Sequence, residues 1–125
     1  MPIDAALVFA GGGLGAVFRW LLSKAAFKLY GSEFPWGTLA VNLAGCLLIG
    51  LAVGAIERGL LPPRARPALV AGFLGGFTTF STYAFGSFEL MRRGDWGIAL
   101  IQALASNCAG IALAAIGWAI VIKRF

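Results

Sequence analysis

The sequence predicts an all-α membrane protein built from four transmembrane helices. Of its 125 residues, 60% are hydrophobic and only 12% are charged, whereas soluble domains are roughly 45–50% apolar and about 25% charged. Such a chain has too little polar surface for a water-soluble globule and too many apolar residues to be disordered. Because a bilayer-crossing helix needs about 20 apolar residues, a chain of 125 residues has room for four spans and short loops.

Four apolar segments, bounded by charges or turn residues, define the spans. The first contains one charge well inside it, Arg19, whereas the second and the fourth contain none. Pro62 and Pro63 mark the loop before the third segment, whose only charge, Glu89, lies near its end. We expect the spans over about residues 3–30, 36–56, 67–91 and 96–122, in a single four-helix transmembrane domain that covers residues 1–125.

The third span is expected to be broken near its middle. Gly75 and Gly76 form a weak point for a helix, and Thr78 and Thr79 follow them with poor helix propensity. Non-helical backbone at membrane depth is tolerated only where it is buried in protein or lines a cavity, and unwound carbonyls at such places commonly bind cations. The alternative is a helix that is only kinked.

The basic residues divide almost evenly between the two sides of the membrane. With four spans, both termini lie on one side, which collects Arg58, Arg64, Arg66, Lys123 and Arg124. The other side has Lys24, Lys28, Arg92 and Arg93. A membrane protein takes one orientation when Lys and Arg are in clear excess on one side. Five basic residues against four permit the chain to insert in both orientations and to form an antiparallel homodimer. The alternative is a single orientation set by other features. The net charge of +5 therefore indicates membrane-surface anchors and not a nucleic-acid partner.

Glycine is abundant, with 18 copies, and several pairs are four residues apart. Small residues at that spacing allow helices to approach closely in lipid. We expect tight helix packing and an oligomer from the pairs Gly11–Gly15, Gly50–Gly54, Gly72–Gly76 and Ser106–Gly110.

Enzymatic chemistry is not expected. The chain has no histidine, its acidic residues lie in loops or at segment ends, and no nucleophile has a plausible base partner. Cys46 and Cys108 both fall in apolar segments, where they fit packing better than a disulfide or a metal site.

Neutral polar groups inside the spans are the candidates for function. Thr38 and Asn42 share one helix face, as do Gln102 and Ser106, because both pairs are four residues apart. Polar groups in a membrane usually face the bundle interior or a water-filled cavity, although hydrogen bonds that only hold helices together are the simpler explanation for a Ser or Thr. The densest set is in the third span: Thr78, Thr79, Ser81 and Thr82.

An anion is the favoured substrate. Phe80 and Tyr83 are three residues apart, and the electropositive edges of aromatic rings can face an anion, although ordinary packing is the commoner role. Arg19 either reaches the interface or draws anions toward a vestibule. Mid-membrane acids that could bind a cation are absent from the sequence.

Three stretches closely resemble the Fluc/CrcB fluoride channels: Gly75-Gly-Phe-Thr-Thr-Phe-Ser-Thr-Tyr83, Gly37-Thr-Leu-Ala-Val-Asn-Leu-Ala-Gly45 and Gly15-Ala-Val-Phe-Arg19. The resemblance extends over all four segments. It implies a passive fluoride-selective channel in the cell (inner) membrane, built as an antiparallel dual-topology homodimer with two pores. Such a channel exports fluoride down its electrochemical gradient and protects the cell from fluoride toxicity.

The resemblance also implies roles for individual residues. Asn42 would donate a hydrogen bond to fluoride, Phe80 would present its ring edge, and Arg19 would lie in the vestibule. The backbone carbonyls of Gly75 and Thr78 would hold a structural Na⁺ at the dimer centre. The remaining pathway residues are Thr38, Ser81, Thr82, Tyr83 and Ser106.

Two positions depart from the family pattern. Tyr83 stands where the second aromatic residue is usually Phe, so its hydroxyl could donate to fluoride or narrow the path. Gly86 occupies a position where the family often has Glu, and Glu89 lies one turn later.

Two other functions compete with a fluoride channel. Small dual-topology multidrug or guanidinium exporters also have four short helices, but proton-coupled cation export is expected to need an acid inside the membrane. The first segment offers Arg19 there, and Asp4 only at its edge. A purely structural membrane subunit is the third possibility.

Overall fold

The computed structural model describes residues 2–125, and all regular structure in this range is helical. It contains four helices long and apolar enough to cross a membrane: Pro2–Tyr30, Trp36–Glu57, Pro67–Arg92 and Trp96–Arg124. The prediction of an all-helical chain with four apolar spans is confirmed.

The first two spans are continuous α-helices, whereas the last two are divided. α1 covers Pro2–Tyr30 and α2 covers Trp36–Glu57. The third span consists of the π-helix η1 (Pro67–Leu74), the short α3 (Gly75–Phe77) and α4 (Phe80–Arg92). The fourth consists of α5 (Trp96–Leu104), the π-helix η2 (Ala105–Ala109) and α6 (Gly110–Arg124).

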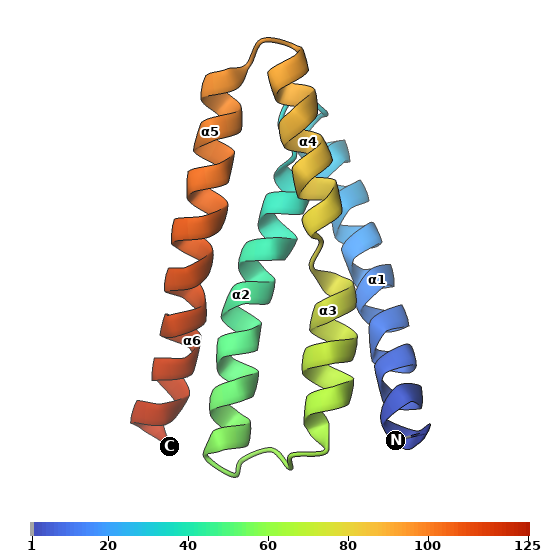
Figure 1. Ribbon diagram of the computed structural model, residues 1–125, viewed down its shortest axis with the longest axis vertical. Helices are drawn as coiled ribbons and strands as arrows, with labels where there is room; N and C mark the ends of the chain where they lie inside the picture. Colours follow the sequence, from blue (N-terminus) through green and yellow to red (C-terminus); the bar gives the residue numbers. More distant parts are fainter. Residues whose placement is uncertain (1) are drawn as a thin grey trace.

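The spans form an antiparallel bundle with both chain ends at the same end (Figure 1). The turn between α2 and η1 lies at that end, and the turns after α1 and α4 lie at the opposite end. α2 packs most extensively against α6, and α1 packs most extensively against η1. Gly94, with a φ of 89°, allows the tight turn from α4 into α5 because a positive φ carries no steric penalty for glycine.

Glycines bring paired helices close together, as the four-residue spacing predicted. A Cβ added at Gly15 would overlap the Phe73 carbonyl of η1, and one added at Gly50 would overlap the Ala114 carbonyl of α6. Small residues therefore mediate both main helix pairs, as is usual where lipid surrounds the bundle.

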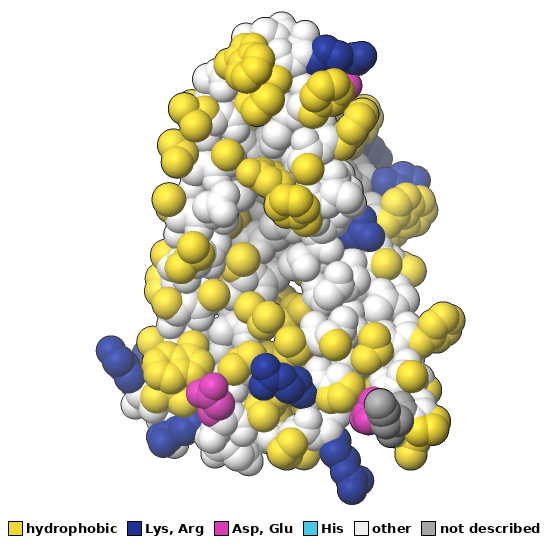
Figure 2. Space-filling view, viewed as in Figure 1, with side chains coloured by type: hydrophobic (Ala, Val, Ile, Leu, Met, Phe, Trp, Pro, Cys, Tyr) yellow, Lys and Arg dark blue, Asp and Glu magenta, His cyan; other side chains and the backbone are white. Residues whose placement is uncertain are grey.

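Most large apolar side chains lie on the surface of the chain. Phe9 is 85% exposed and Phe80 is 78% exposed, whereas the buried core contains only a few residues such as Val41 and Leu90. On the face shown in Figure 2, hydrophobic side chains are spread along the whole length, and most charged side chains lie toward the two ends. An apolar surface of this extent fits contact with lipid or with another protein in the membrane.

Candidate functional site

The candidate site surrounds two extended residues in the third span. Thr78 has φ −87° and ψ 157°, and Thr79 has φ −150° and ψ 121°, so α3 ends at Phe77 and α4 begins at Phe80. The span bends by 18°. The backbone therefore leaves the helical pattern for two residues while the span continues in nearly the same direction.

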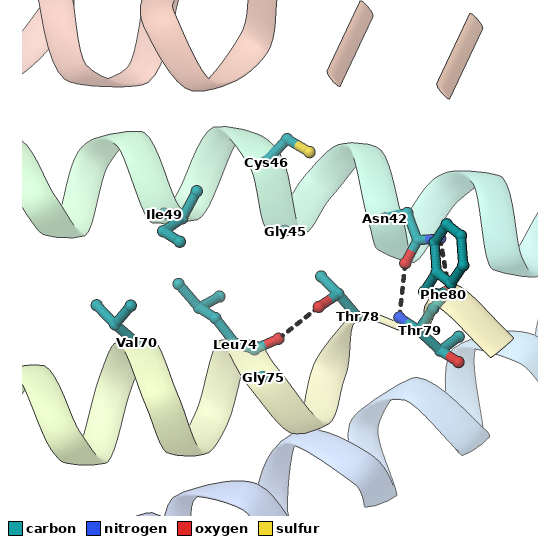
Figure 3. A pocket seen from close by; sticks show the side chains of 10 residues that line it. All are labelled: Asn42, Gly45, Cys46, Ile49, Val70, Leu74, Gly75, Thr78, Thr79 and Phe80. Carbon is teal, nitrogen blue, oxygen red and sulfur yellow. Dashed lines mark hydrogen bonds between the residues drawn. The ribbon is translucent and has the colours of Figure 1, made fainter. Parts of the chain in front are cut away.

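Asn42 of α2 binds the backbone of Thr79 through both ends of its side-chain amide (Figure 3). The Thr79 N–H donates to Asn42 Oδ1 at 2.8 Å, and Asn42 Nδ2 donates to the Thr79 carbonyl at 2.9 Å. A primary amide has two N–H donors, so one N–H of Asn42 is still available. The amide is thus held in one orientation with a donor to spare.

Thr79 also organises the start of α4 through its side chain. Its Oγ1 accepts from the Thr82 N–H at 3.4 Å, donates to Thr82 Oγ1 at 3.2 Å, and lies 3.4 Å from Ser81 Oγ. Sequence analysis placed Thr79 in the polar run but assigned it no role at the site. A Thr directly before a new helical segment is a preferred N-cap, and that signal could have identified it.

Arg19 of α1 is attached to the same region from the opposite side. Its Nε donates to the Gly76 carbonyl at 3.0 Å, and the side chain is partly buried. Arg19 is therefore bonded to the third span and does not simply extend toward the membrane surface.

Two carbonyls beside the extended residues lose the donors that a continuous helix would provide. The Thr79 N–H, which would reach the Gly75 carbonyl, donates to Asn42. The Thr82 N–H, which would reach the Thr78 carbonyl, donates to Thr79 Oγ1. Gly75 and Thr78 are the two predicted sodium ligands. For each of them, the backbone N–H four residues later donates to a side-chain oxygen and not to the carbonyl of the predicted ligand. Exposed backbone oxygens are suitable ligands for a hard cation such as Na⁺.

A cavity of about 340 Å³ lies between α2 and the third span and brings four of the predicted residues together. Asn42, Gly75, Thr78 and Phe80 all line it, and Figure 3 shows these four residues around it. The face in Figure 2 is hollowed near its middle, between α2 and α3. Thr38 is buried and lines a separate cavity of about 190 Å³ at the turn between α1 and α2.

The two aromatic residues of α4 lie side by side, as their spacing predicted. The ring centroids of Phe80 and Tyr83 are 5.6 Å apart with an interplanar angle of 51°. Phe80 is largely exposed and Tyr83 is half-buried. Ser81 and Thr82 are exposed on the first turn of the same helix, so this end of α4 presents hydroxyls and aromatic rings together.

The other predicted positions lie apart from this cluster. Ser106 is in η2 of the fourth span and lines neither cavity. Glu89 forms an ion pair with Arg92 at 3.0 Å in the last turn of α4. A Cβ added at Gly86 would lie 3.7 Å from the Pro35 ring, so a larger residue there would contact the turn before α2.

Comparison with known proteins identifies the family. Residues 6–118 match the family described as "CrcB-like protein, Camphor Resistance (CrcB)". The chain is 44% identical over 119 residues to the "Fluoride-specific ion channel FluC" of Agrobacterium fabrum, with 94% of this chain and 95% of the relative covered. It is 41% identical over 123 residues to the protein of the same name from Rhizobium johnstonii, with 98% and 97% covered. A third protein of that name, from Magnetococcus marinus, is 43% identical over 105 residues, with 83% and 85% covered. The chain belongs to the CrcB-like protein family.

Proposed function

We propose that this chain is a fluoride-selective channel that lets fluoride leave the cell passively and so protects the cell from fluoride toxicity. The chain is a multi-pass protein of the cell (inner) membrane and a transport protein, not an enzyme. Relatives 40–44% identical carry the name of a fluoride-specific ion channel. The observation that carries the proposal is the Asn42 amide, which is fixed by Thr79 with one donor left over and lines the same cavity as Phe80.

The pathway replaces the hydration shell of fluoride with fixed donors. The spare N–H of Asn42 donates to the ion, and the electropositive edges of Phe80 and Tyr83 face it. Hydroxyl groups continue the path at Thr38, Ser81, Thr82 and Ser106, and Arg19 attracts anions to the vestibule. Donors in a channel must bind firmly enough to admit the ion and weakly enough to release it. Fluoride is small, so it gains more from each close donor than a larger halide does.

The working unit is an antiparallel dual-topology homodimer with two pores. Five basic residues on one side against four on the other give no clear orientation signal, so both insertions occur. The largely exposed Phe80 and the open cavity beside it give a second copy an apolar surface to cover. The two extended residues of the third span act as a break in the helix at the centre of this dimer.

A structural Na⁺ would be held at the dimer centre by the backbone carbonyls of Gly75 and Thr78. Both lie where a side chain accepts the N–H that a continuous helix would direct to that carbonyl, which supports this assignment. With two carbonyls from each of two copies, four oxygen ligands would be available to the ion, and its positive charge would offset the carbonyl dipoles.

A proton-coupled exporter of multidrug or guanidinium cations fits less well. Such a transporter is expected to need an acid inside the membrane to bind its substrate. The acidic residues of this chain lie at helix ends or in turns: Asp4, Glu33, Glu57, Glu89 and Asp95. Arg19 is the charge found well inside a span, and it favours an anion.

Fluoride efflux from liposomes that contain the purified protein tests this proposal. Vesicles loaded with potassium fluoride are diluted into fluoride-free buffer, valinomycin balances the charge, and an electrode records fluoride. We expect rapid efflux without a proton gradient and no comparable chloride efflux. Transport that occurs only with a proton gradient would contradict the channel, and equal chloride efflux would contradict the selectivity.

A further inference from the structure

A groove of about 450 Å³ opens where the turn after α2 enters the third span. Its walls are apolar apart from one arginine and consist of Pro63, Arg66, Pro67, Val70 and Ala71. These residues run from the turn before η1 to the middle of η1. In a membrane, the groove therefore extends from the surface of the bilayer into the hydrocarbon layer, and none of its residues belongs to the proposed fluoride pathway.

The backbone holds Arg66 at the membrane-surface end of this groove. The Arg66 N–H donates to the Pro63 carbonyl at 3.1 Å, and the Ala65 N–H donates to the Pro62 carbonyl at 2.8 Å. Proline fixes φ, so the prolines on both sides of Arg66 limit the conformations of the turn. The groove is therefore formed before a ligand binds, which lowers the entropic cost of binding.

The guanidinium of Arg66 is available to a ligand. It is exposed and makes no hydrogen bond or ion pair among residues 2–125. Arg19, Arg92 and Arg93, by contrast, each donate to an oxygen of the chain. Arg64, two residues before Arg66, is also exposed and has no intramolecular partner in the described part of the chain. This turn therefore offers two sets of cationic donors to a group with negatively charged oxygens.

The groove lies on a side of η1 that α1 does not cover. A Cβ added at Gly11 of α1 would overlap the Ala68 carbonyl, and one added at Gly72 would lie 3.0 Å from the Val8 carbonyl. Ala68 and Gly72 thus face α1, and Val70, two residues from both, lies on the opposite side of η1. The apolar walls are therefore open to the molecules that surround the bundle.

Charge favours a phospholipid over a second copy of the chain as the occupant. The end of the bundle beside the groove has two acids, Asp4 and Glu57, against five basic residues: Arg58, Arg64, Arg66, Lys123 and Arg124. On the face in Figure 2, dark blue side chains gather at this end. In the proposed antiparallel dimer, the partner would place its other end here, where four basic residues exceed the three acids. That end supplies no excess negative charge, whereas anionic headgroups are attracted to basic clusters.

We propose that this groove binds an anionic phospholipid, whose phosphate pairs with Arg66 and whose acyl chain lies along Val70 and Ala71. A guanidinium can donate two parallel hydrogen bonds to phosphate oxygens, and the apolar walls bury part of the chain. Val70 also lines the cavity between α2 and the third span, so the lipid lies directly beside the surface that a second copy would cover. In a dual-topology pair, one such lipid would lie in each leaflet.

Native mass spectrometry of the purified protein in detergent tests the charge contact. The protein is titrated with phosphatidylglycerol, or with phosphatidylcholine that has the same acyl chains. We expect half-maximal retention of phosphatidylglycerol at about tenfold lower concentration, and we expect Arg66→Gln to remove this preference, the effect of one charge-assisted hydrogen bond. Arg124→Gln is the matched control, because it removes the same charge at the same end but outside the groove, and it should keep the preference.

A second variant tests the groove without a change of charge. Ala71→Phe fills the groove and should raise the phosphatidylglycerol concentration for half-maximal retention about tenfold. Ala115→Phe, at an exposed position of α6 outside the groove, should behave like the wild type. If Arg66→Gln aggregates, Ala71→Phe and its control decide the question.

Four results would overturn the site. The first is equal retention of the two lipids by the wild type, and the second is an equal loss of preference in Arg124→Gln, which would indicate diffuse attraction. The third is wild-type retention by Ala71→Phe. The fourth is displacement of the lipid by inorganic phosphate at the same concentration, which would indicate a site for a free anion. Fluoride does not enter the measurement, so this site and the proposed channel function fail independently.

Discussion

Asn42 binds both the N–H and the carbonyl of Thr79, at 2.8 and 2.9 Å. This reciprocal pair joins α2 to the third span at the point where the third span is extended. It also fixes the rotation of the amide, so the remaining N–H has one direction. One residue thus supports the backbone and presents a donor at the same time.

Asn42→Asp should abolish most fluoride efflux. The carboxylate lacks the N–H donors, opposes the Thr79 carbonyl, and repels an anion. Loss of the hydrogen bonds at this partly buried site costs about 1–3 kcal/mol, so we expect efflux at least about tenfold slower. Liposome efflux measures this, with size-exclusion elution as the check on folding. Unchanged flux would remove Asn42 from the pore.

Thr79→Val should slow efflux, whereas Thr79→Ser should not. Valine has nearly the shape of threonine but lacks the hydroxyl that caps α4, and loss of such a cap costs about 1 kcal/mol. We expect Thr79→Val to lower the melting temperature and to reduce the efflux rate several-fold. Equal behaviour of the two variants would show that the Thr79 hydroxyl has no part in the site.

Arg19→Lys should impair the protein although the charge is preserved. Lysine cannot reproduce the planar Nε–H that donates to the Gly76 carbonyl at 3.0 Å. The expected loss is about 1.5–3 kcal/mol of stability, typical of a hydrogen bond to a charged group, with slower efflux. Thermal melting measures the loss. Arg64→Lys, at an exposed loop position, is the control and should melt like the wild type; equal melting of both variants would contradict the role of Arg19.

Gly15→Ala should lower the stability of the protein, whereas Gly13→Ala, on the same helix, should raise it. An added Cβ at Gly15 overlaps the Phe73 carbonyl, whereas one at Gly13 meets nothing within 4 Å. Overpacking typically costs about 1–3 kcal/mol, while alanine for glycine in an open helical position gains up to about 1 kcal/mol. Intrinsic tryptophan fluorescence during heating measures the melting temperature of each variant. Similar melting of the two variants would contradict the close approach of α1 to η1.

Replacement of sodium with N-methylglucamine should weaken the proposed dimer. The carbonyls of Gly75 and Thr78 would then face one another without a cation. We expect slower efflux and a lower melting temperature, both restored by sodium. Cross-linking at graded sodium concentrations provides an independent readout. A dimer whose conduction and stability ignore sodium would contradict the site.

Hydropathy was sufficient to predict the four apolar helices. The spans begin and end within two residues of the expected segments, because charges and prolines lie directly at their ends. The weak helix propensity of Gly75, Gly76, Thr78 and Thr79 coincides with the two extended residues, Thr78 and Thr79. The span bends by only 18°, so a helix broken near its middle stays a prediction. The π-helical segments η1 and η2 were not predicted, since they depend on packing between helices and not on local residue preferences.

The contacts at the site were less accessible to sequence analysis. The polar type of Asn42 marked it as a candidate, but its partner Thr79 lies 37 residues away and is found only through packing of α2 on the third span. The bond from Arg19 to Gly76 spans 57 residues and is equally non-local. Gln102 was recognised as polar, yet its complete burial follows from how α5 packs on α4.

The placement of both chain ends at the same end of the bundle limits how two copies can be joined in one polypeptide. In an antiparallel pair, the C-terminus of the first copy and the N-terminus of the second lie on opposite sides of the membrane. A flexible soluble linker cannot connect them. A tandem fusion therefore needs an additional crossing helix of about 20 apolar residues between the copies, and a fusion without it would enforce a parallel arrangement.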